Sequence, residues 1–269
     1  MAEEERLKEE ATLCAILRNM RSVAIAYSGG VDSAALLAVA MRELGERALA
    51  VTGRSPSMAK GELELASRVA RDLGARHEII DTREFDDPRY RANPRERCFY
   101  CKDELYGRLA EMARRGGFAW VADGFNADDG REPLDRRPGR AAARAHSVRS
   151  PLAEAGIGKA DVRAIAKRYG LEVWDKPATP CLSSRIPYGT RVETDDLRKV
   201  DLAEQYLRAR GFGVVRVRHF GSVARLEVPI GDVGRLRAAK NEIGGVLRSV
   251  GYEDVEIDDR GYRTGSLNE

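Results

Sequence analysis

Apolar residues in the first two thirds of the chain form short β-branched runs, separated by longer amphipathic or Ala/Leu-rich stretches. The short runs predict strands at residues 22–27, 47–52, 76–80, 118–122 and 171–174. The longer stretches predict helices at residues 3–19, 34–45, 60–73, 102–115 and 159–169. Strands that alternate with helices indicate an α/β fold, in which a parallel sheet carries helices on both faces.

A proline-rich segment at residues 176–189 interrupts this pattern and shows little periodicity, which is typical of a domain boundary. We therefore predict an α/β domain at residues 1–180 and a small α+β domain at residues 186–269. The pattern of the second domain predicts a helix at 194–210, a hairpin of 214–218 and 223–228, a helix at 231–249 and a strand at 255–257.

Composition narrows the class of protein. Charged residues make up 33% of the 269 residues, and no apolar run approaches the roughly 20 residues that cross a bilayer. The acidic amino end does not resemble a signal peptide, so we expect a soluble, cytoplasmic protein without a membrane partner. The net charge of +3 does not indicate nucleic acid, and we expect no such partner. The arginine-rich stretch 131–149 fits either a solvated loop or a mobile loop that meets a phosphorylated substrate.

A glycine-containing turn, Ser28–Ser33, joins the first predicted strand to an Ala/Leu-rich helix. A turn of this kind forms an anion site from backbone N–H groups and the helix dipole, although a simple strand-to-helix turn is the plainer alternative. The run resembles the loop of the PP-loop ATP pyrophosphatases, and it lacks the Gly-Lys-Ser/Thr of a Walker loop. The resemblance implies that Ser28, Gly29, Gly30 and Ser33 hold the phosphates of ATP, which is cleaved between its α and β phosphates. It also implies that Asp32 helps to place Mg²⁺.

Two further segments are predicted to lie beside this turn. Thr52 ends the second strand, and Gly124 belongs to the 123–129 loop that follows the fourth strand. Ligands of parallel α/β sheets bind outside the carboxyl ends of the strands. We therefore expect Thr52 and Gly124 to contribute to nucleotide binding.

Three of the four cysteines occur where chemistry is expected. Cys98 and Cys101 form a C-x2-C pair at the entry to a helix, and this spacing lets both sulfurs reach one ion. Cys181 lies in the proline-rich segment, whereas Cys14 falls on an apolar helix face and is interpreted as a core residue. Three thiolates suit an iron–sulfur cluster with one open iron; a redox or packed C-x2-C pair is the alternative.

Taken together, six segments follow the order found in the LarE family of ATP-dependent sulfur transferases, which the chain resembles over nearly its whole length. These segments are residues 28–33, 93–102, 123–129, 180–189, 204–207 and 215–219. The resemblance implies that ATP and Mg²⁺ adenylate a carboxylate of a pyridinium dicarboxylate mononucleotide. A sulfur nucleophile then replaces AMP and leaves a thiocarboxylate. The family also implies a homo-oligomer, with a hexamer as one form.

The source of sulfur divides that family. Some members give up the sulfur of the cysteine at the position of Cys181, and others hold a [4Fe–4S] cluster with three cysteines and pass on a bound sulfide. Because Cys98 and Cys101 are both present, the chain resembles the cluster-bearing kind, with Cys181 as the third ligand and sulfide or another sulfur donor as a partner.

Several polar and charged residues after Cys181 are further candidates. Ser184 and Arg185 flank the sulfur site, and Arg185 is expected to meet the activated carboxylate or a phosphate. Arg216 and Arg218 are two residues apart on a strand and so share a face, where they suit the phosphate of the small-molecule substrate or form a solvated sheet face. Two acidic residues match family positions and are expected to contact substrate or metal, or else to form surface salt bridges: Glu204 and Glu227.

Three other functions use some of these features. A tRNA-thiolating PP-loop enzyme also uses cysteines and a cluster, but no RNA-binding module is recognisable in the sequence. An amide-forming ligase of the NAD or GMP synthetase type leaves Cys98, Cys101 and Cys181 unexplained. A zinc-stabilised nucleotide-binding module without catalysis does not account for Asp32 and Ser33.

Overall fold

The computed structural model describes residues 2–129 and 138–263, which form two compact units. The first unit contains the chain up to Ser55, then Gly61–Asp87 and Glu96–Thr179. The second unit contains Pro56–Lys60, Pro88–Arg95 and the chain from Pro180 on. Two short segments of the amino-terminal half therefore pack with the carboxyl-terminal unit.

The first unit is built on a four-stranded parallel sheet in the order β3-β2-β1-β4. Its strands are β1 (Val23–Ala26), β2 (Ala48–Arg54), β3 (Arg76–Asp81) and β4 (Trp120–Asp123). Strand β1 lies in the middle of the sheet, where Ile25 is paired with Ala50 of β2 and with Ala122 of β4. The α/β fold predicted from the alternation of strands and helices is thereby confirmed.

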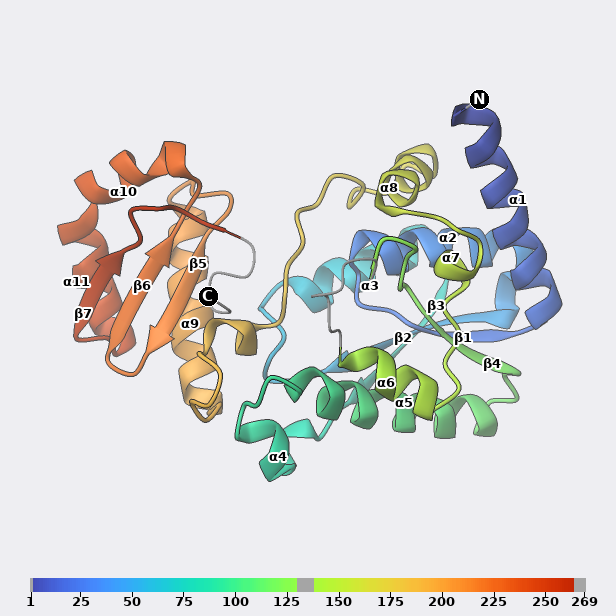
Figure 1. Ribbon diagram of the computed structural model, residues 1–269, viewed down its shortest axis with the longest axis horizontal. Coiled ribbons are helices and arrows are strands. Elements are labelled where there is room, and N and C mark those ends of the chain that lie inside the picture. The colour runs from blue at the N-terminus through green and yellow to red at the C-terminus, as the bar shows by residue number, and fades with distance from the viewer. Residues whose placement is uncertain (1, 130–137, 264–269) are drawn as a thin grey trace. The chain divides into compact units, whose positions relative to one another are not determined.

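Helices cover both faces of this sheet, as Figure 1 shows. One face packs on α1 (Ala2–Met20), α2 (Val31–Leu44), α3 (Glu62–Asp72) and α8 (Lys159–Arg168). The other face packs on α5 (Arg97–Arg115), beside which lies α6 (Gly139–Ala145). Residues along β1 alternate accordingly: Val23 and Ile25 join the core with α2, and Ala24 joins the core with α5. The four-residue helix α7 (Pro151–Glu154) also belongs to the first unit. Another four-residue helix, α4 (Pro88–Arg91), belongs to the second unit.

The second unit contains a three-stranded sheet in the order β5-β6-β7. Strands β5 (Arg216–Phe220) and β6 (Val223–Glu227) form an antiparallel hairpin, and β7 (Asp254–Ile257) is parallel to β6. The accompanying helices are α9 (Thr194–Ala209), α10 (Val233–Ala238) and α11 (Lys240–Val250). None of the described helices is long and apolar enough to cross a membrane.

Three predicted elements differ from the structure. Residues 171–174 form turns rather than a strand, because the side chains of Leu171 and Val173 pack into the helical core on one face of the sheet. The helix predicted at 102–115 begins earlier, at Arg97, so that the C-x2-C pair lies within its first turns. The helix predicted at 231–249 is divided at Ala239, which has φ −93° and ψ 3°.

Candidate active site

The turn after β1 is held in shape by its own hydroxyl groups. The Ser33 hydroxyl accepts a hydrogen bond from the backbone N–H of Ser28 and donates one to the carbonyl of Gly30, both at 3.2 Å. The Ser28 hydroxyl accepts from the N–H of Gly30 at 3.3 Å. Two side chains of the turn therefore close it through hydrogen bonds within residues 28–33.

The amino end of α2 begins directly after this turn and is open to a ligand. Among the described residues, no side chain caps this end of the helix. The first N–H groups of a helix have no partner within the helix and carry partial positive charge. The turn and α2 therefore have the backbone arrangement of an anion site, and their contact with phosphates stays a prediction.

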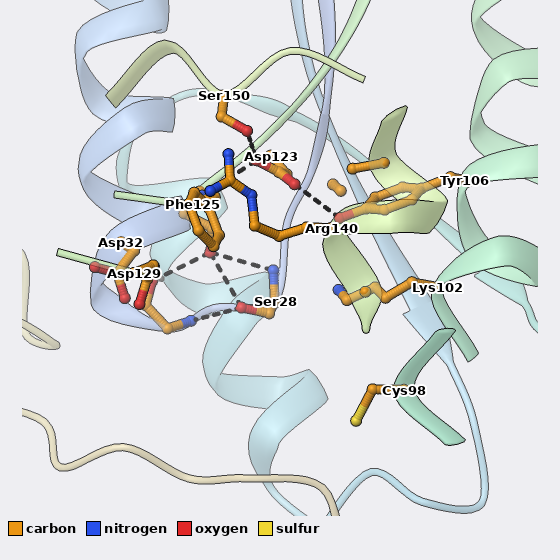
Figure 2. A pocket seen from close by; sticks show the side chains of 16 residues that line it. Ser28, Asp32, Cys98, Lys102, Tyr106, Asp123, Phe125, Asp129, Arg140 and Ser150 are labelled. Atoms are coloured by element: carbon orange, nitrogen blue, oxygen red, sulfur yellow. Dashed lines mark hydrogen bonds between the residues drawn. The ribbon is translucent and has the colours of Figure 1, made fainter. Parts of the chain in front are cut away.

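A cavity of about 360 Å³ lies in front of this turn within the first unit. Figure 2 shows the Lys102 side chain reaching from α5 toward Ser28 on the opposite side of the cavity. Arg140 of α6 also lines the cavity, where its guanidinium stacks on the ring of Phe125 at 4.1 Å. Two cations thus face an anion site across one cavity.

Asp123 forms the base of the cavity at the end of β4. Its carboxylate accepts hydrogen bonds from the hydroxyls of Tyr106 and Ser150, each at 2.8 Å, and from the N–H of Phe125 at 3.2 Å (Figure 2). Burial, together with the negative charge of Asp123, raises the pKa of Tyr106, so this phenol stays a hydrogen-bond donor. The network fixes the position of Asp123 before any ligand arrives.

Asp32, in the first turn of α2, is held by two donors. Its carboxylate accepts from the Asn126 amide at 3.1 Å and from the Lys159 ammonium at 2.5 Å. Asp129 lines the same cavity, so two carboxylates lie beside the anion site. Carboxylate oxygens suit Mg²⁺, which usually takes one or two of them together with substrate phosphates. No three His, Cys, Asp or Glu side chains gather as a metal site within the described part of the chain. Asp32 and Asp129 therefore fit a Mg²⁺ ion that is held largely by the nucleotide.

Gly124 and Thr52, predicted to contact the nucleotide, support the turn in different ways. A Cβ atom at Gly124 would lie 2.7 Å from the backbone nitrogen of Ser33, so the β4 loop approaches α2 as only glycine allows. Thr52 is 1% exposed, and its hydroxyl donates to the carbonyl of Tyr27 at 2.7 Å. His77 lies 2.8 Å from the same hydroxyl, and burial lowers the pKa of this histidine. Thr52 therefore holds the residue before the turn instead of lining the cavity.

The three candidate cysteines are accessible. Cys98 is exposed and lines the cavity, and Cys101 follows one helical turn later with an intermediate exposure. Cys181 belongs to the second unit, where it is exposed directly before the 3₁₀ turn Leu182–Arg185. Cys14 is buried in the helical core, as the apolar face of its helix predicts.

Only part of the arginine-rich stretch 131–149 can be described. Residues 130–137 lie outside the described residues. Beyond them, the Arg140 guanidinium is turned onto the cavity, and that of Arg149 lies over the ring of Trp120 at 5.1 Å.

In the second unit, Arg185 and Glu204 form an ion pair with no exposed side-chain surface. The guanidinium donates to both carboxylate oxygens of Glu204, at 2.8 and 2.9 Å, and this carboxylate also accepts from Arg208 and from the N–H of Val217. Burial alone would raise the pKa of Glu204, but the hydrogen bonds and charge of Arg185 outweigh it and hold the pKa below its ordinary value. Glu204 is therefore charged and fully paired.

The same guanidinium fixes the backbone around Cys181. It donates to the carbonyls of Pro180 at 2.5 Å and Cys181 at 3.1 Å, and to the Ser184 hydroxyl at 3.0 Å. The complete burial of Arg185 argues against its predicted contact with a carboxylate or phosphate of the substrate. Its position instead makes it a support for the cysteine-bearing segment, and Glu204 supports Arg185.

Arg216 and Arg218 are both buried on β5, each with 6% exposure. Arg218 donates to one carboxylate oxygen of Glu227, at 3.0 and 2.8 Å, and to the Ser184 carbonyl at 3.0 Å. The Arg216 guanidinium lies over the Tyr262 ring at 5.2 Å, and burial, followed by the positive charge of Arg185, lowers its pKa. Neither arginine is on a solvated sheet face, which was the alternative interpretation. Glu227 pairs with Arg218 inside the unit, not in a surface salt bridge.

Comparison of the sequence with known proteins shows the family of this chain. A family model described as asparagine synthase matches residues 10–112. The chain is 36% identical over 262 residues to the pyridinium-3,5-bisthiocarboxylic acid mononucleotide synthase of Lactiplantibacillus plantarum, an alignment that covers 97% of this chain and 94% of that enzyme. The chain belongs to the LarE family.

Two further proteins are similar over most of their length. A protein of Synechocystis sp., described as uncharacterized, is 44% identical over 246 residues, which cover 91% of each chain. A protein of Methanocaldococcus jannaschii with the same description is 29% identical over 244 residues. Membership of the LarE family agrees with the resemblance drawn from the six sequence segments.

Three residues of this LarE-family site were not predicted to have a role: Lys102, Tyr106 and Lys159. Lys102 follows Cys101 directly and Tyr106 lies one turn further along α5, so a helix that begins at Arg97 would have indicated both. Arg140 belongs to the arginine-rich stretch 131–149, for which contact with a phosphorylated substrate is one of the two interpretations given above. Lys159 reaches the site through tertiary packing, for which the sequence contains no local signal.

The buried pair of Arg185 and Glu204 generates a stability prediction for this LarE-family protein. Arg185→Met leaves a buried carboxylate without its main partner, which costs about 3–5 kcal/mol of unfolding free energy. The matched control is Arg225→Met in the same unit, because Arg225 pairs with Glu256 at the surface and its loss costs about 1 kcal/mol or less. Urea denaturation measures both variants. Equal unfolding free energies for the two would contradict the support role of Arg185.

Proposed function

We propose that this LarE-family protein is an ATP-dependent sulfur transferase that converts a carboxylate of a pyridinium dicarboxylate mononucleotide into a thiocarboxylate. The observation that carries the proposal is the cavity of the first unit, which joins the anion site at α2, the Asp32 carboxylate and the Cys98 thiol. The name of the similar enzyme from Lactiplantibacillus plantarum, a bisthiocarboxylic acid mononucleotide synthase, indicates the substrate class.

The first step in this proposal is adenylation. A carboxylate oxygen of the substrate attacks the α-phosphorus of ATP, and the bond to pyrophosphate breaks. The N–H groups at the start of α2 hold the charge of the departing pyrophosphate. Lys102 and Arg140 lie across the cavity, where their charges stabilise the α-phosphate during the attack. Mg²⁺ beside Asp32 and Asp129 would supply further charge neutralisation of the phosphates.

The second step replaces AMP by sulfur. A sulfur nucleophile attacks the carbonyl carbon of the acyl adenylate, and AMP leaves with the oxygen that first attacked phosphorus. A carboxylate is a poor electrophile, and attachment to AMP gives it a good leaving group. The exposure of Cys98 on the cavity supports a role of the C-x2-C pair in this step.

The sulfur donor is proposed from the accessible cysteines. Cys98 and Cys101 are one helical turn apart, and Cys181 is exposed, so all three thiols can bind an exogenous group. We infer that these cysteines hold a [4Fe–4S] cluster, which when bound would supply a sulfide as nucleophile. If Cys181 itself gave up its sulfur, the chain would instead carry dehydroalanine after one turnover.

The second unit is proposed to bind the phosphate of the mononucleotide. Arg216 and Arg218 lie on one strand, and the planar guanidinium suits a phosphate. The Ser184 carbonyl and Glu227 hold the Arg218 side chain in place. In this proposal Ser184, Glu227 and the two arginines form the substrate side of the reaction, and Arg185 with Glu204 positions Cys181.

Turnover tests the proposed function. The protein, prepared without oxygen, is expected to form pyrophosphate and thiocarboxylate in equal amounts from ATP, Mg²⁺, sulfide and pyridinium-3,5-dicarboxylate mononucleotide. Asp32→Ala is expected to lower pyrophosphate formation by about a hundredfold or more, because it removes a carboxylate at the phosphates. Asp72→Ala, an exposed position at the end of α3, is the control and is expected to behave as wild type. Pyrophosphate formation that does not require the carboxylate substrate would contradict the proposal.

Iron and acid-labile sulfide, measured after purification without oxygen, test the cluster. We expect about four of each per chain, with loss of most of both in Cys98→Ser and Cys101→Ser. Cys14→Ser is the control, because Cys14 is buried in the core away from the cavity and its loss is expected to leave the iron content unchanged. Absence of iron and sulfide in the wild type, with loss of one sulfur from the protein mass after a turnover, would assign the sulfur to Cys181 instead.

A further inference from the structure

Lys159 lies beside the phosphate-binding turn although it is 127 residues away from Asp32 in the chain. It is the first residue of α8, and its ammonium is 2.5 Å from an Asp32 carboxylate oxygen. Its side chain is 40% exposed and that of Asp32 is 27% exposed. The ion pair is therefore open to a ligand that approaches the amino end of α2.

The position of Lys159 is fixed by its backbone. Its N–H donates to the carboxylate of Asp128 at 2.6 Å. The residue before it, Gly158, is extended with φ −90° and ψ 178°, and a Cβ there would lie 2.6 Å from the same Asp128 carboxylate. The start of α8 can approach the β4 loop this closely because residue 158 has no side chain.

Asn126 connects this contact to the turn. Its side-chain oxygen accepts from the N–H of Asp128 at 2.9 Å, and its side-chain nitrogen donates to Asp32 at 3.1 Å. Asp32 is thus held between the Asn126 amide and the Lys159 ammonium. The ammonium thus contacts Asp32, while the β4 loop holds both the backbone of Lys159 and the carboxylate of Asp32.

We propose that Lys159 is a catalytic residue that binds the pyrophosphate released from ATP. This inference rests on the proposed function. A lysine ammonium has three N–H donors, and the contact with Asp32 uses one of them. The others are available for phosphate oxygens at the open edge of the ion pair. The positive charge also balances Asp32, whose negative charge would otherwise repel a polyphosphate at the anion site.

As the α–β bond breaks, negative charge accumulates on the pyrophosphate oxygens, and Lys159 stabilises this charge as the group leaves. AMP carries none of the departing phosphates. Lys159 is therefore expected to affect the binding of pyrophosphate much more than the binding of AMP. This difference separates a phosphate contact from a general contribution to the fold.

Calorimetric titration of the full chain with pyrophosphate, and separately with AMP, both in the presence of Mg²⁺, tests the inference. Lys159→Met is expected to weaken pyrophosphate binding by about 10- to 100-fold, and AMP binding by no more than about threefold. Lys159→Arg keeps the charge and is expected to retain most of the pyrophosphate affinity. Lys167→Met on the same helix removes the same charge from the opposite end, where its ammonium lies over the Trp174 ring, and is expected to match wild type.

Unchanged pyrophosphate affinity in Lys159→Met would overturn the inference. An equal loss of pyrophosphate and AMP affinity, with a lower melting temperature, would also overturn it, because Lys159 would then act through the fold. Failure of the wild type to bind either ligand would instead overturn the proposed function itself, and the inference with it.

Discussion

The close approach of three backbone segments around the amino end of α2 is the constraint on which the site depends. Gly29 has a φ of +72°, and a Cβ there would lie 2.7 Å from that of Ala66 on α3. A Cβ at Gly124 would likewise lie 2.7 Å from the backbone nitrogen of Ser33. Side chains at these positions would push α3 or the β4 loop away from α2. With glycine at both, the turn is compact and the N–H groups at the start of α2 remain open to a phosphate.

The two units use charge differently. In the first unit, Lys102 and Arg140 line the cavity, and Lys159 pairs with Asp32, which also lines it. All three cations are accessible, so their charge is available to a ligand. In the second unit, Arg185 is enclosed with Glu204 and its donors are directed at the backbone around Cys181. A buried pair of this kind adds little net stability, yet it is expensive to break, which makes it suitable for fixing one conformation of a loop.

The sequence predicted those features of the fold and of the site that depend on residues close together in the chain. The alternation of strands and helices gave the parallel sheet, and Ser28–Ser33 indicated the anion site, because strand, turn and helix are consecutive in the chain. It did not find Lys159, which reaches Asp32 only through packing. It predicted a strand at 171–174 because buried helix-packing residues and buried strand residues have the same apolar pattern. The sequence predicts a ligand contact for Arg185, because the charge of the residue does not reveal that its side chain is buried.

The central claim is that ATP activates a carboxylate which sulfur then converts to a thiocarboxylate. The most direct measurement uses a pyridinium dicarboxylate mononucleotide with ¹⁸O in its carboxylates, and follows the label by mass spectrometry of the AMP formed. Adenylation followed by sulfur attack at the carbonyl carbon transfers one labelled oxygen to each AMP. Formation of thiocarboxylate together with unlabelled AMP would contradict an acyl adenylate and with it the account given for this site.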